Sequence, residues 1–248
     1  MGQKLGQHFL IRGAVLARIA AAACPEEAKL VIEIGAGKGA LTEHLLDRAG
    51  RVIAIELDAT LAAGLTRRFA GEPRLRVVHA DILATDLTQW GPAVVAGNLP
   101  YYITSPVVER TVAMGSLLQR AVFLVQREVA DRLAAKPCTR DYGFLSVATQ
   151  LFAEAQRLFR VPPSAFSPPP NVESAVVRLT PYPDIVQADP SPLLAFVGLC
   201  FRQKRKTLRN NLGPIFGYER VDALPEAGLR AEQLTLEQFR ALYRRLAG

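Results

Sequence analysis

Short apolar runs alternate with helical patterns between Leu30 and Thr180, and this alternation gives the first indication of the fold. Leu61, Leu65 and Phe69 recur at i, i+4 and i+8, which is the spacing of an amphipathic helix. Strands that alternate with helices predict a mostly parallel sheet with crossover helices. The predicted strands cover residues 30–34, 51–56, 75–78, 93–96, 121–125, 156–161 and 174–179.

The composition shifts near Pro181, and the chain beyond it shows no strand pattern. Thr235 and Gln238 have the spacing of a capping box at the start of a helix. One helical face is expected to carry Leu194, Val197, Phe201, Leu208 and Leu212, and Gln203 or Lys204 is expected to interrupt that helix. A final helix is expected to bury Leu236, Phe239, Leu242, Tyr243 and Leu246. We therefore expect a sheet domain over residues 1–182 and a small all-helical domain over residues 183–248.

Composition narrows the class of protein. The 248 residues include 30 Lys and Arg against 23 Asp and Glu, a net charge of +7, which favours a polyanionic partner and nucleic acid first. Cys24, Cys138 and Cys200 are far apart and odd in number, so they fit neither a disulfide framework nor a metal site. No apolar run approaches the ~20 residues that span a bilayer, and none near the start resembles a signal peptide. We expect a cytoplasmic protein that binds no membrane.

A glycine-rich turn, Gly35-Ala36-Gly37-Lys38-Gly39, follows the first predicted strand. Glycines at this point let the backbone turn tightly and approach a ligand closely. The third glycine comes one residue too early for the dinucleotide fingerprint, which argues against a nicotinamide cofactor. Glu56 ends the second strand and Asp81 follows the third, so the glycine turn and both acids lie at successive strand ends. In a doubly wound sheet these ends line one crevice.

Asn98-Leu99-Pro100-Tyr101 follows the apolar run 93–96 in the same way. This segment offers an amide, a fixed turn and an aromatic ring together. We interpret it as a site for a flat heterocycle that carries an exocyclic amine, although most Asn-x-Pro segments are only turns.

Together these strand-end residues resemble the class I S-adenosylmethionine-dependent methyltransferases, whose sheet is Rossmann-like. Further segments resemble the ribosomal RNA adenine dimethyltransferases: Gly6 to Leu10 (GQHFL), Phe123 to Val129 (FLVQREV) and Val161 to Val172 (VPPSAFSPPPNV). Phe201 to Leu208 (FRQKRKTL) is similar to the small-subunit, or 16S rRNA, branch. The resemblance covers nearly the whole chain. It implies N6-dimethylation of two adjacent adenosines near the 3′ end of 16S rRNA during small-subunit assembly.

The resemblance also implies roles for single residues in binding S-adenosyl-L-methionine. His8 and Leu10 close over the cofactor, although the family usually has Asn at the position of His8. Gly35 meets the methionine part and Gly37 belongs to the same turn. The implied contacts of the remaining residues are Glu56 on the ribose, Asp81 on the adenine amine and Asn98 beside the donor methyl.

For the chemistry, we expect the Asn98 side-chain oxygen and the Pro100 carbonyl to accept the two hydrogens of the adenine amine. Tyr101 is expected to stack on the target base, and Phe166 to close the other face of that base. The alternative for Phe166 is a loop anchor in the core, because buried aromatic residues are common. Catalysis is then mainly orientation and stabilisation of growing positive charge, with no strong general base.

Arg202, Arg205, Lys206 and Arg209 fall at i, i+3, i+4 and i+7, which predicts one cationic helical face. Such a face contacts RNA phosphates, whereas the alternative is an ordinary solvated face. We expect 16S rRNA within the small subunit or its precursor as the partner, and a monomer. Three other functions stay open: a 23S rRNA adenine methyltransferase of the macrolide-resistance type, a non-catalytic RNA-binding assembly factor and, more remotely, a Rossmann dehydrogenase.

Overall fold

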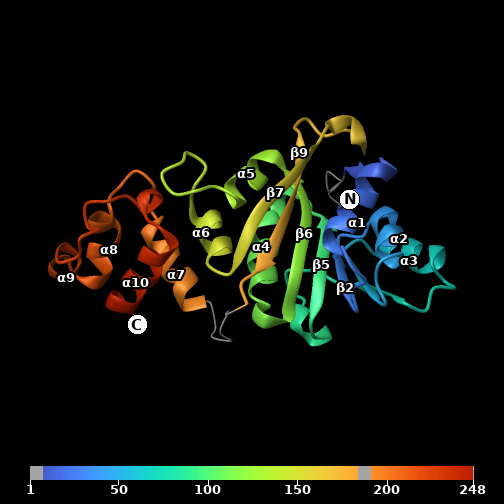
Figure 1. The fold of residues 1–248 in the computed structure, drawn as a ribbon, viewed down its shortest axis with the longest axis horizontal. Coiled ribbons are helices and arrows are strands. Elements are labelled where there is room, and N and C mark those ends of the chain that lie inside the picture. The colour runs from blue at the N-terminus through green and yellow to red at the C-terminus, as the bar shows by residue number, and fades with distance from the viewer. Residues whose placement is uncertain (1–7, 184–190, 248) are drawn as a thin grey trace. The chain divides into compact units, whose positions relative to one another are not determined.

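The computed structural model describes residues 8–183 and 191–247 (Figure 1). The chain divides into two compact units, each built from two chain segments. Unit 1 contains Met1–Ala130 and Ala153–Val186, and unit 2 contains Asp131–Phe152 and Gln187–Gly248. We expected a single boundary at residue 182, and the structure differs in that the segment 131–152 belongs to the helical unit.

Unit 1 is built on a seven-stranded sheet in the order β4-β3-β2-β5-β6-β9-β7 (Figure 1). Strands β2 to β6 pair in parallel, whereas β9 pairs antiparallel with β6, and β7 with β9. The strands are β2 (Val31–Ile34), β3 (Val52–Glu56), β4 (Leu75–His79), β5 (Ala93–Asn98), β6 (Leu118–Gln126), β7 (Ala153–Val161) and β9 (Ser174–Pro181). Each of the seven predicted strands is confirmed, and the α/β class with it.

The helices of unit 1 bury their apolar faces on this sheet. They are α1 (Gly13–Ala23), α2 (Ala40–Leu46), α3 (Ala59–Arg68), α4 (Thr104–Val112) and α5 (Arg127–Leu133), of which α5 crosses into unit 2. All residues of β2 and β3 are buried. A parallel sheet covered on both faces requires such continuous burial, which explains why its strands appear as unbroken apolar runs in the sequence. Leu45 and Ile19 are fully buried in the core cluster that joins α1 and α2 to the sheet.

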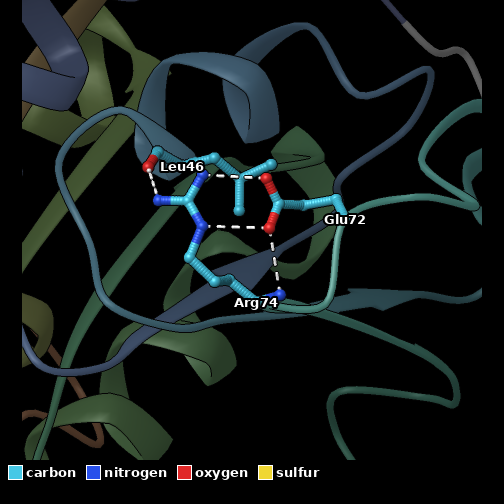
Figure 2. A network of polar contacts seen from close by, with 3 residues as sticks. All are labelled: Leu46, Glu72 and Arg74. Carbon is cyan, nitrogen blue, oxygen red and sulfur yellow. Dashed lines mark hydrogen bonds and ion pairs between the residues drawn. The ribbon is translucent and has the colours of Figure 1, made fainter.

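A polar network fixes the entry of the chain into β4 (Figure 2). The Arg74 guanidinium donates from Nε and Nη2 to the two carboxylate oxygens of Glu72, at 2.9 and 2.8 Å. Its Nη1 donates to the carbonyl of Leu46 at the end of α2, at 2.8 Å. The planar guanidinium therefore links two chain segments 28 residues apart through one side chain.

A second, two-stranded sheet pairs β1 (Phe9–Leu10) antiparallel with β8 (Phe166–Ser167). The backbone amide of Ile11 extends this pairing by donating to the carbonyl of Ala165 at 2.9 Å. Pairing of β1 with β8 brings the start of the described chain to the proline-rich connection between β7 and β9. Sequence patterns did not predict it, and Gly6 and Gln7 of the segment that we singled out lie outside the described residues.

In its described part, unit 2 consists of helices and turns. The helices beyond α5 are α6 (Phe144–Gln150), α7 (Ser191–Cys200), α8 (Leu208–Phe216), α9 (Tyr218–Asp222) and α10 (Leu236–Leu246). Tyr142, Phe196 and Phe239 are buried in one apolar core. The predicted capping box is confirmed, because Thr235 Oγ1 accepts from the Gln238 amide while the Gln238 side chain accepts from the Thr235 amide.

The interruption expected at Gln203 or Lys204 is confirmed. The predicted cationic helical face around Arg205 is wrong, because residues 201–206 form turns and a bend between α7 and α8, and Thr207 forms an isolated bridge with Arg230. Asn211, buried in α8, explains the break. Its Nδ2 donates to the carbonyl of Cys200 at 2.8 Å, and its Oδ1 accepts from the amide of Gln203 at 3.1 Å. These bonds satisfy backbone groups that a continuing helix would have paired internally.

Across 8–183 and 191–247, none of the helices combines the length and apolar character needed to cross a membrane. The same part of the chain holds no group of three or more His, Cys, Asp or Glu side chains arranged to bind a metal ion.

Candidate active site

The order of the strands determines where the site lies. β2 is flanked by β3 on one side and by β5 on the other: the chain runs outward from β2 through β3 to β4 and then returns to the other side of β2 as β5. In an open parallel sheet, ligands bind at this switch point, outside the carboxyl ends of the strands. A cavity of about 540 Å³ lies there. Its wall contains the sequence-predicted residues His8, Leu10, Gly35, Gly37, Glu56, Asp81, Asn98, Pro100 and Tyr101.

The glycine turn forms the floor of the cavity. Gly37 has a φ of +59°, a conformation that favours glycine, and its amide donates to Glu56 Oε2 at 2.8 Å. A Cβ at Gly37 would lie 3.2 Å from the Phe9 ring, so any side chain there would press on β1. The turn therefore needs glycine both for its conformation and for the space beside Phe9.

Glycine also brings β5 close to β2. A Cβ at Gly97 would collide with the carbonyl oxygen of Ile34, so only glycine permits this approach. The approach places the next residue, Asn98, beside the turn: a Cβ at Gly35 would lie 3.5 Å from the Asn98 carbonyl oxygen. The amide-bearing segment and the glycine turn are thus neighbours in space.

The two predicted acids of the cavity wall, Glu56 and Asp81, lie in different settings. Glu56 is buried, and its Oε1 accepts from the Asp58 amide at 2.9 Å while Oε2 accepts from Gly37. A carboxylate has about four acceptor positions, so two hydrogen bonds fix Glu56 and leave it able to accept more. Asp81 is exposed, and its Oδ1 accepts from the Leu83 amide at 2.8 Å. The Asp81 carboxylate therefore faces a ligand from the rim of the cavity, and Glu56 from its interior.

Asn98 is held from outside its own strand. Its side-chain Nδ2 donates to the main-chain carbonyl of His8 at 3.1 Å. The His8 ring in turn bonds the Pro168 carbonyl through Nδ1, at 2.8 Å. Because a carbonyl only accepts, Nδ1 carries the proton. The two bonds connect β1, β5 and the proline-rich segment around one amide.

Tyr101 stands next to this amide in a short 3₁₀ turn (Tyr101–Ile103). Its hydroxyl oxygen lies 2.9 Å from Ser174 Oγ, and its ring stacks with the His8 imidazole at 6.0 Å between centroids and 28° between planes. Burial raises the pKa of the Tyr101 phenol, which the hydrogen bond with Ser174 partly offsets. The phenol is therefore neutral at physiological pH.

Two expectations about this wall are corrected. Phe166 is buried in the core, paired through β8 with Leu10, and among the described residues it is absent from the cavity wall. It is a loop anchor and not a second face for a base.

The carbonyl of Pro100 already accepts from the Ile103 amide and from Thr104 Oγ1, both at 3.2 Å. Both of its lone pairs are used within the turn, so it is a poor acceptor for a substrate amine.

Sequence reasoning gave no role to Glu33, which lies two residues before Gly35 and lines the cavity. Burial raises the pKa of this carboxyl to about 7. A 2.6 Å hydrogen bond from Thr42 Oγ1 lowers this pKa, and the nearby charge of Glu56 raises it. The sequence does show an acid inside the apolar run that forms β2. An acid at such a buried strand position is the signal that could have identified Glu33 as a site residue.

The four predicted RNA-binding residues do not share one helix. Arg202, Arg205 and Lys206 are exposed in the turns 201–207, whereas Arg209 lies in α8. Arg209 forms an ion pair with Asp222, at 2.6 Å, and its guanidinium lies 4.9 Å from the centre of the Tyr218 ring. Arg209 is therefore engaged within unit 2. Of the four predicted RNA-binding residues, Arg202, Arg205 and Lys206 in the turn remain as the candidate cationic surface.

Comparison with known proteins identifies the family. Residues 2–247 match the family model described as ribosomal RNA adenine dimethylase. A ribosomal RNA small subunit methyltransferase A from Acidobacterium capsulatum is 46% identical, covering 98% of this chain and 90% of the relative; one from Acinetobacter baylyi is 43% identical, covering 97% and 90%.

Two solved structures are similar over nearly the full length. A dimethyladenosine transferase from Plasmodium falciparum has a TM-score of 0.81 at 25% identity, covering 96% of each chain. The 23S rRNA methyltransferase ErmE has a TM-score of 0.71 at 30% identity, covering 97% of this chain and all of that one. The cavity at the switch point, its strand-end residues and these matches lead to one conclusion. The chain belongs to the ribosomal RNA adenine dimethylase family.

Proposed function

We propose that the protein uses S-adenosyl-L-methionine to dimethylate N6 of two adjacent adenosines near the 3′ end of 16S rRNA, in the cytoplasm, during small-subunit assembly. One observation carries the proposal: the Asn98 amide is fixed beside Tyr101 at the mouth of a cavity whose floor is a glycine turn and whose interior holds a buried acid. The curated relatives are named as small-subunit enzymes, which favours this branch of the family.

The residues of the cavity fit the cofactor. Gly35 and Gly37 leave a cradle that a Cβ would narrow, since Gly37 lies beside the Phe9 ring and Gly35 beside the Asn98 carbonyl. Glu56 has spare acceptor positions for two ribose hydroxyls, and Asp81 accepts from an adenine amine at the rim, where the buried Ile82 lines the wall. Leu10 and the main chain of His8 close the cavity from the side of β1. When bound, the cofactor supplies a sulfonium methyl group.

Asn98 orients the nucleophile. The lone pair on N6 of adenine is delocalised into the ring, so the nitrogen must gain tetrahedral character before it attacks a methyl group. Because Nδ2 of Asn98 is engaged by His8, Oδ1 is the atom that accepts a hydrogen of the amine. Holding that hydrogen aligns the lone pair and stabilises the positive charge that grows on nitrogen.

Tyr101 binds the target base by stacking. A base has to leave its helical stack before an enzyme can reach it, and an aromatic ring compensates the lost stacking. The neutral phenol suits this role. The cationic product amine loses its proton to water, so the reaction needs no histidine or cysteine as a general base.

The exposed turn of unit 2 contacts the rRNA backbone. Arg202, Arg205 and Lys206 are exposed there, and residues 201–207 contain no acid. Phosphates attract such a cluster, and the resulting affinity falls steeply with salt. Arg209 contributes less, because Asp222 already neutralises it.

Transfer of labelled methyl groups tests the proposal. The protein is incubated with labelled S-adenosylmethionine and, in parallel, with undermethylated small subunits, large subunits and free 23S rRNA. Label in small-subunit rRNA alone, absent with Asn98→Ala, is the expected result. Label in 23S rRNA would instead assign the chain to the branch of ErmE, which it resembles in fold. Cofactor binding without any transfer would indicate a non-catalytic assembly factor.

A further inference from the structure

Ser174 is a buried polar residue whose hydroxyl meets the wall of the active site. It is fully buried, and its Oγ lies 2.9 Å from the Tyr101 hydroxyl. Tyr101 itself is half-buried and lines the cavity. Seventy-three residues separate the two along the chain. A hydrogen bond over that separation joins the base-binding turn to a different part of the sheet.

The backbone of Ser174 is fixed on both sides. It is the first residue of β9, paired with Gln126 of β6 and with Val161 of β7. Tyr101, by contrast, begins a 3₁₀ turn of three residues that has no side-chain cap. With its Cβ set by that turn and its hydroxyl set by the sheet, the Tyr101 ring is held at both ends of its long axis.

We propose that Ser174 is a positioning residue for methyl transfer: through the hydrogen bond that it shares with Tyr101, it fixes the far end of the ring on which the target adenine stacks. The proposal rests on the function proposed above. Ser174 acts through Tyr101 and does not touch the substrate. The place of the ring matters because Asn98 must meet N6 of the stacked base, and misplacement by about 1 Å costs on the order of a hundredfold in rate.

A double-mutant cycle in the full-length protein separates positioning from general stability. The variants are Ser174→Ala, Tyr101→Phe and the double variant, compared by kcat and KM on undermethylated small subunits. Each single variant should lose roughly two- to tenfold in kcat, the factor that corresponds to one neutral hydrogen bond. The KM for S-adenosylmethionine should stay unchanged. On the Tyr101→Phe background, Ser174→Ala should cost nothing further, because the bond is already absent.

A matched control removes another buried hydroxyl from unit 1. Thr111 is fully buried in α4 and donates to the carbonyl of Val107 at 2.8 Å. Thr111→Val should leave kcat as in the wild type even where it lowers the melting temperature. An equal kcat loss from Ser174→Ala on both Tyr101 backgrounds would overturn the proposal, since it would show a structural effect independent of the phenol.

Fluorine NMR tests the positioning without any substrate. With 3-fluorotyrosine incorporated at position 101, the fluorine lies next to the hydroxyl, so its chemical shift reports the hydrogen bond that the phenol shares with Ser174. Ser174→Ala should shift this resonance, while Thr111→Val should resemble the wild type. Identical spectra for the wild type and Ser174→Ala would overturn the proposal. If the wild type transferred no methyl group to any rRNA, the proposed function would fail, and these spectra would still decide whether Ser174 holds the ring.

Discussion

The side-chain amide of Asn98 donates to the main-chain carbonyl of His8, 90 residues earlier in the chain, at 3.1 Å. This bond fixes the orientation of the Asn98 amide in the cavity wall, and it connects the residue just before β1 directly to the end of β5. Because the acceptor is a main-chain atom, the connection does not depend on the identity of the side chain at position 8.

Asn98→Ala should abolish methyl transfer while leaving S-adenosylmethionine binding within about tenfold of the wild type, as expected for the loss of one positioning group. The measurements are single-turnover transfer to undermethylated small subunits and calorimetric titration with the cofactor. Turnover near that of the wild type would contradict the role that we assign to the Asn98 oxygen.

Tyr101→Ala should weaken binding of the target base by about 1–3 kcal/mol, the value of one base–aromatic stack. The readout is the apparent affinity and rate on an rRNA hairpin that carries the two adenosines. Tyr101→Phe is the control for affinity, because it keeps the stacking face and should lose only the rate that depends on the hydrogen bond with Ser174. If Tyr101→Ala left both quantities unchanged, the ring would serve only the fold.

Glu33→Gln should change how stability depends on pH. The pKa of the Glu33 carboxyl is raised by burial from 4.5 to about 7 in the folded protein. Between these pH values Glu33 has lost its proton in the unfolded chain but keeps it in the folded protein. The free energy of unfolding therefore falls as the pH rises from 4.5 to 7, and it stays lowered above pH 7. The loss is on the order of 3 kcal/mol.

The variant cannot ionise, so its unfolding free energy should fall less over this window, and its melting temperature at pH 8 should exceed that of the wild type. Glu154→Gln, at an exposed position of β7, is the control and should follow the wild type. Denaturant titrations at several pH values measure the effect, and parallel curves for Glu33→Gln and the wild type would refute it.

Reversing the charges of Arg205 and Lys206 to Glu should weaken RNA binding and flatten its dependence on salt. Single neutralisations provide the sharper comparison. Arg205→Gln should reduce the salt slope by about 1, the value of one lost phosphate contact, and Arg209→Gln by less, because Arg209 is paired with Asp222. Filter-binding titrations over a range of salt concentrations measure both. Equal slopes for Arg205→Gln and the wild type would mean that the turn faces away from the RNA.

The sheet could be predicted from the sequence because its strands are buried on both faces and appear as continuous apolar runs. β1 and β8 could not be predicted, since two residues carry no periodicity and their pairing depends on contacts across the chain. An interruption was expected at Gln203 or Lys204, but its extent over 201–207 and its cause could not be predicted, for a related reason. It is stabilised by Asn211, whose bonds to Cys200 and Gln203 override a periodicity that would have continued a helix.

The candidate site could likewise be predicted where it depends on local sequence patterns, and not where it depends on contacts across the chain. Glu56, Asp81 and Asn98 were found from the sequence because the carboxyl ends of neighbouring parallel strands meet at one edge of the sheet. What the sequence did not reveal is how they are held. The partners of Asn98 and Tyr101 lie 90 and 73 residues away, and the buried position of Phe166 is set by its pairing with β1.

Residues 131–152 belong to unit 2 although they lie between two strands of the sheet in unit 1. Their buried side chains, among them Tyr142, Val147 and Leu151, share a core with Phe196 and Phe239. Shortening the chain after residue 186 would therefore not release an intact sheet unit, because it would strip the partners from this apolar surface and leave it open to aggregation. An independent sheet unit needs two changes made together: removal of residues 187–248, and a short linker from α5 to β7 in place of the segment 131–152.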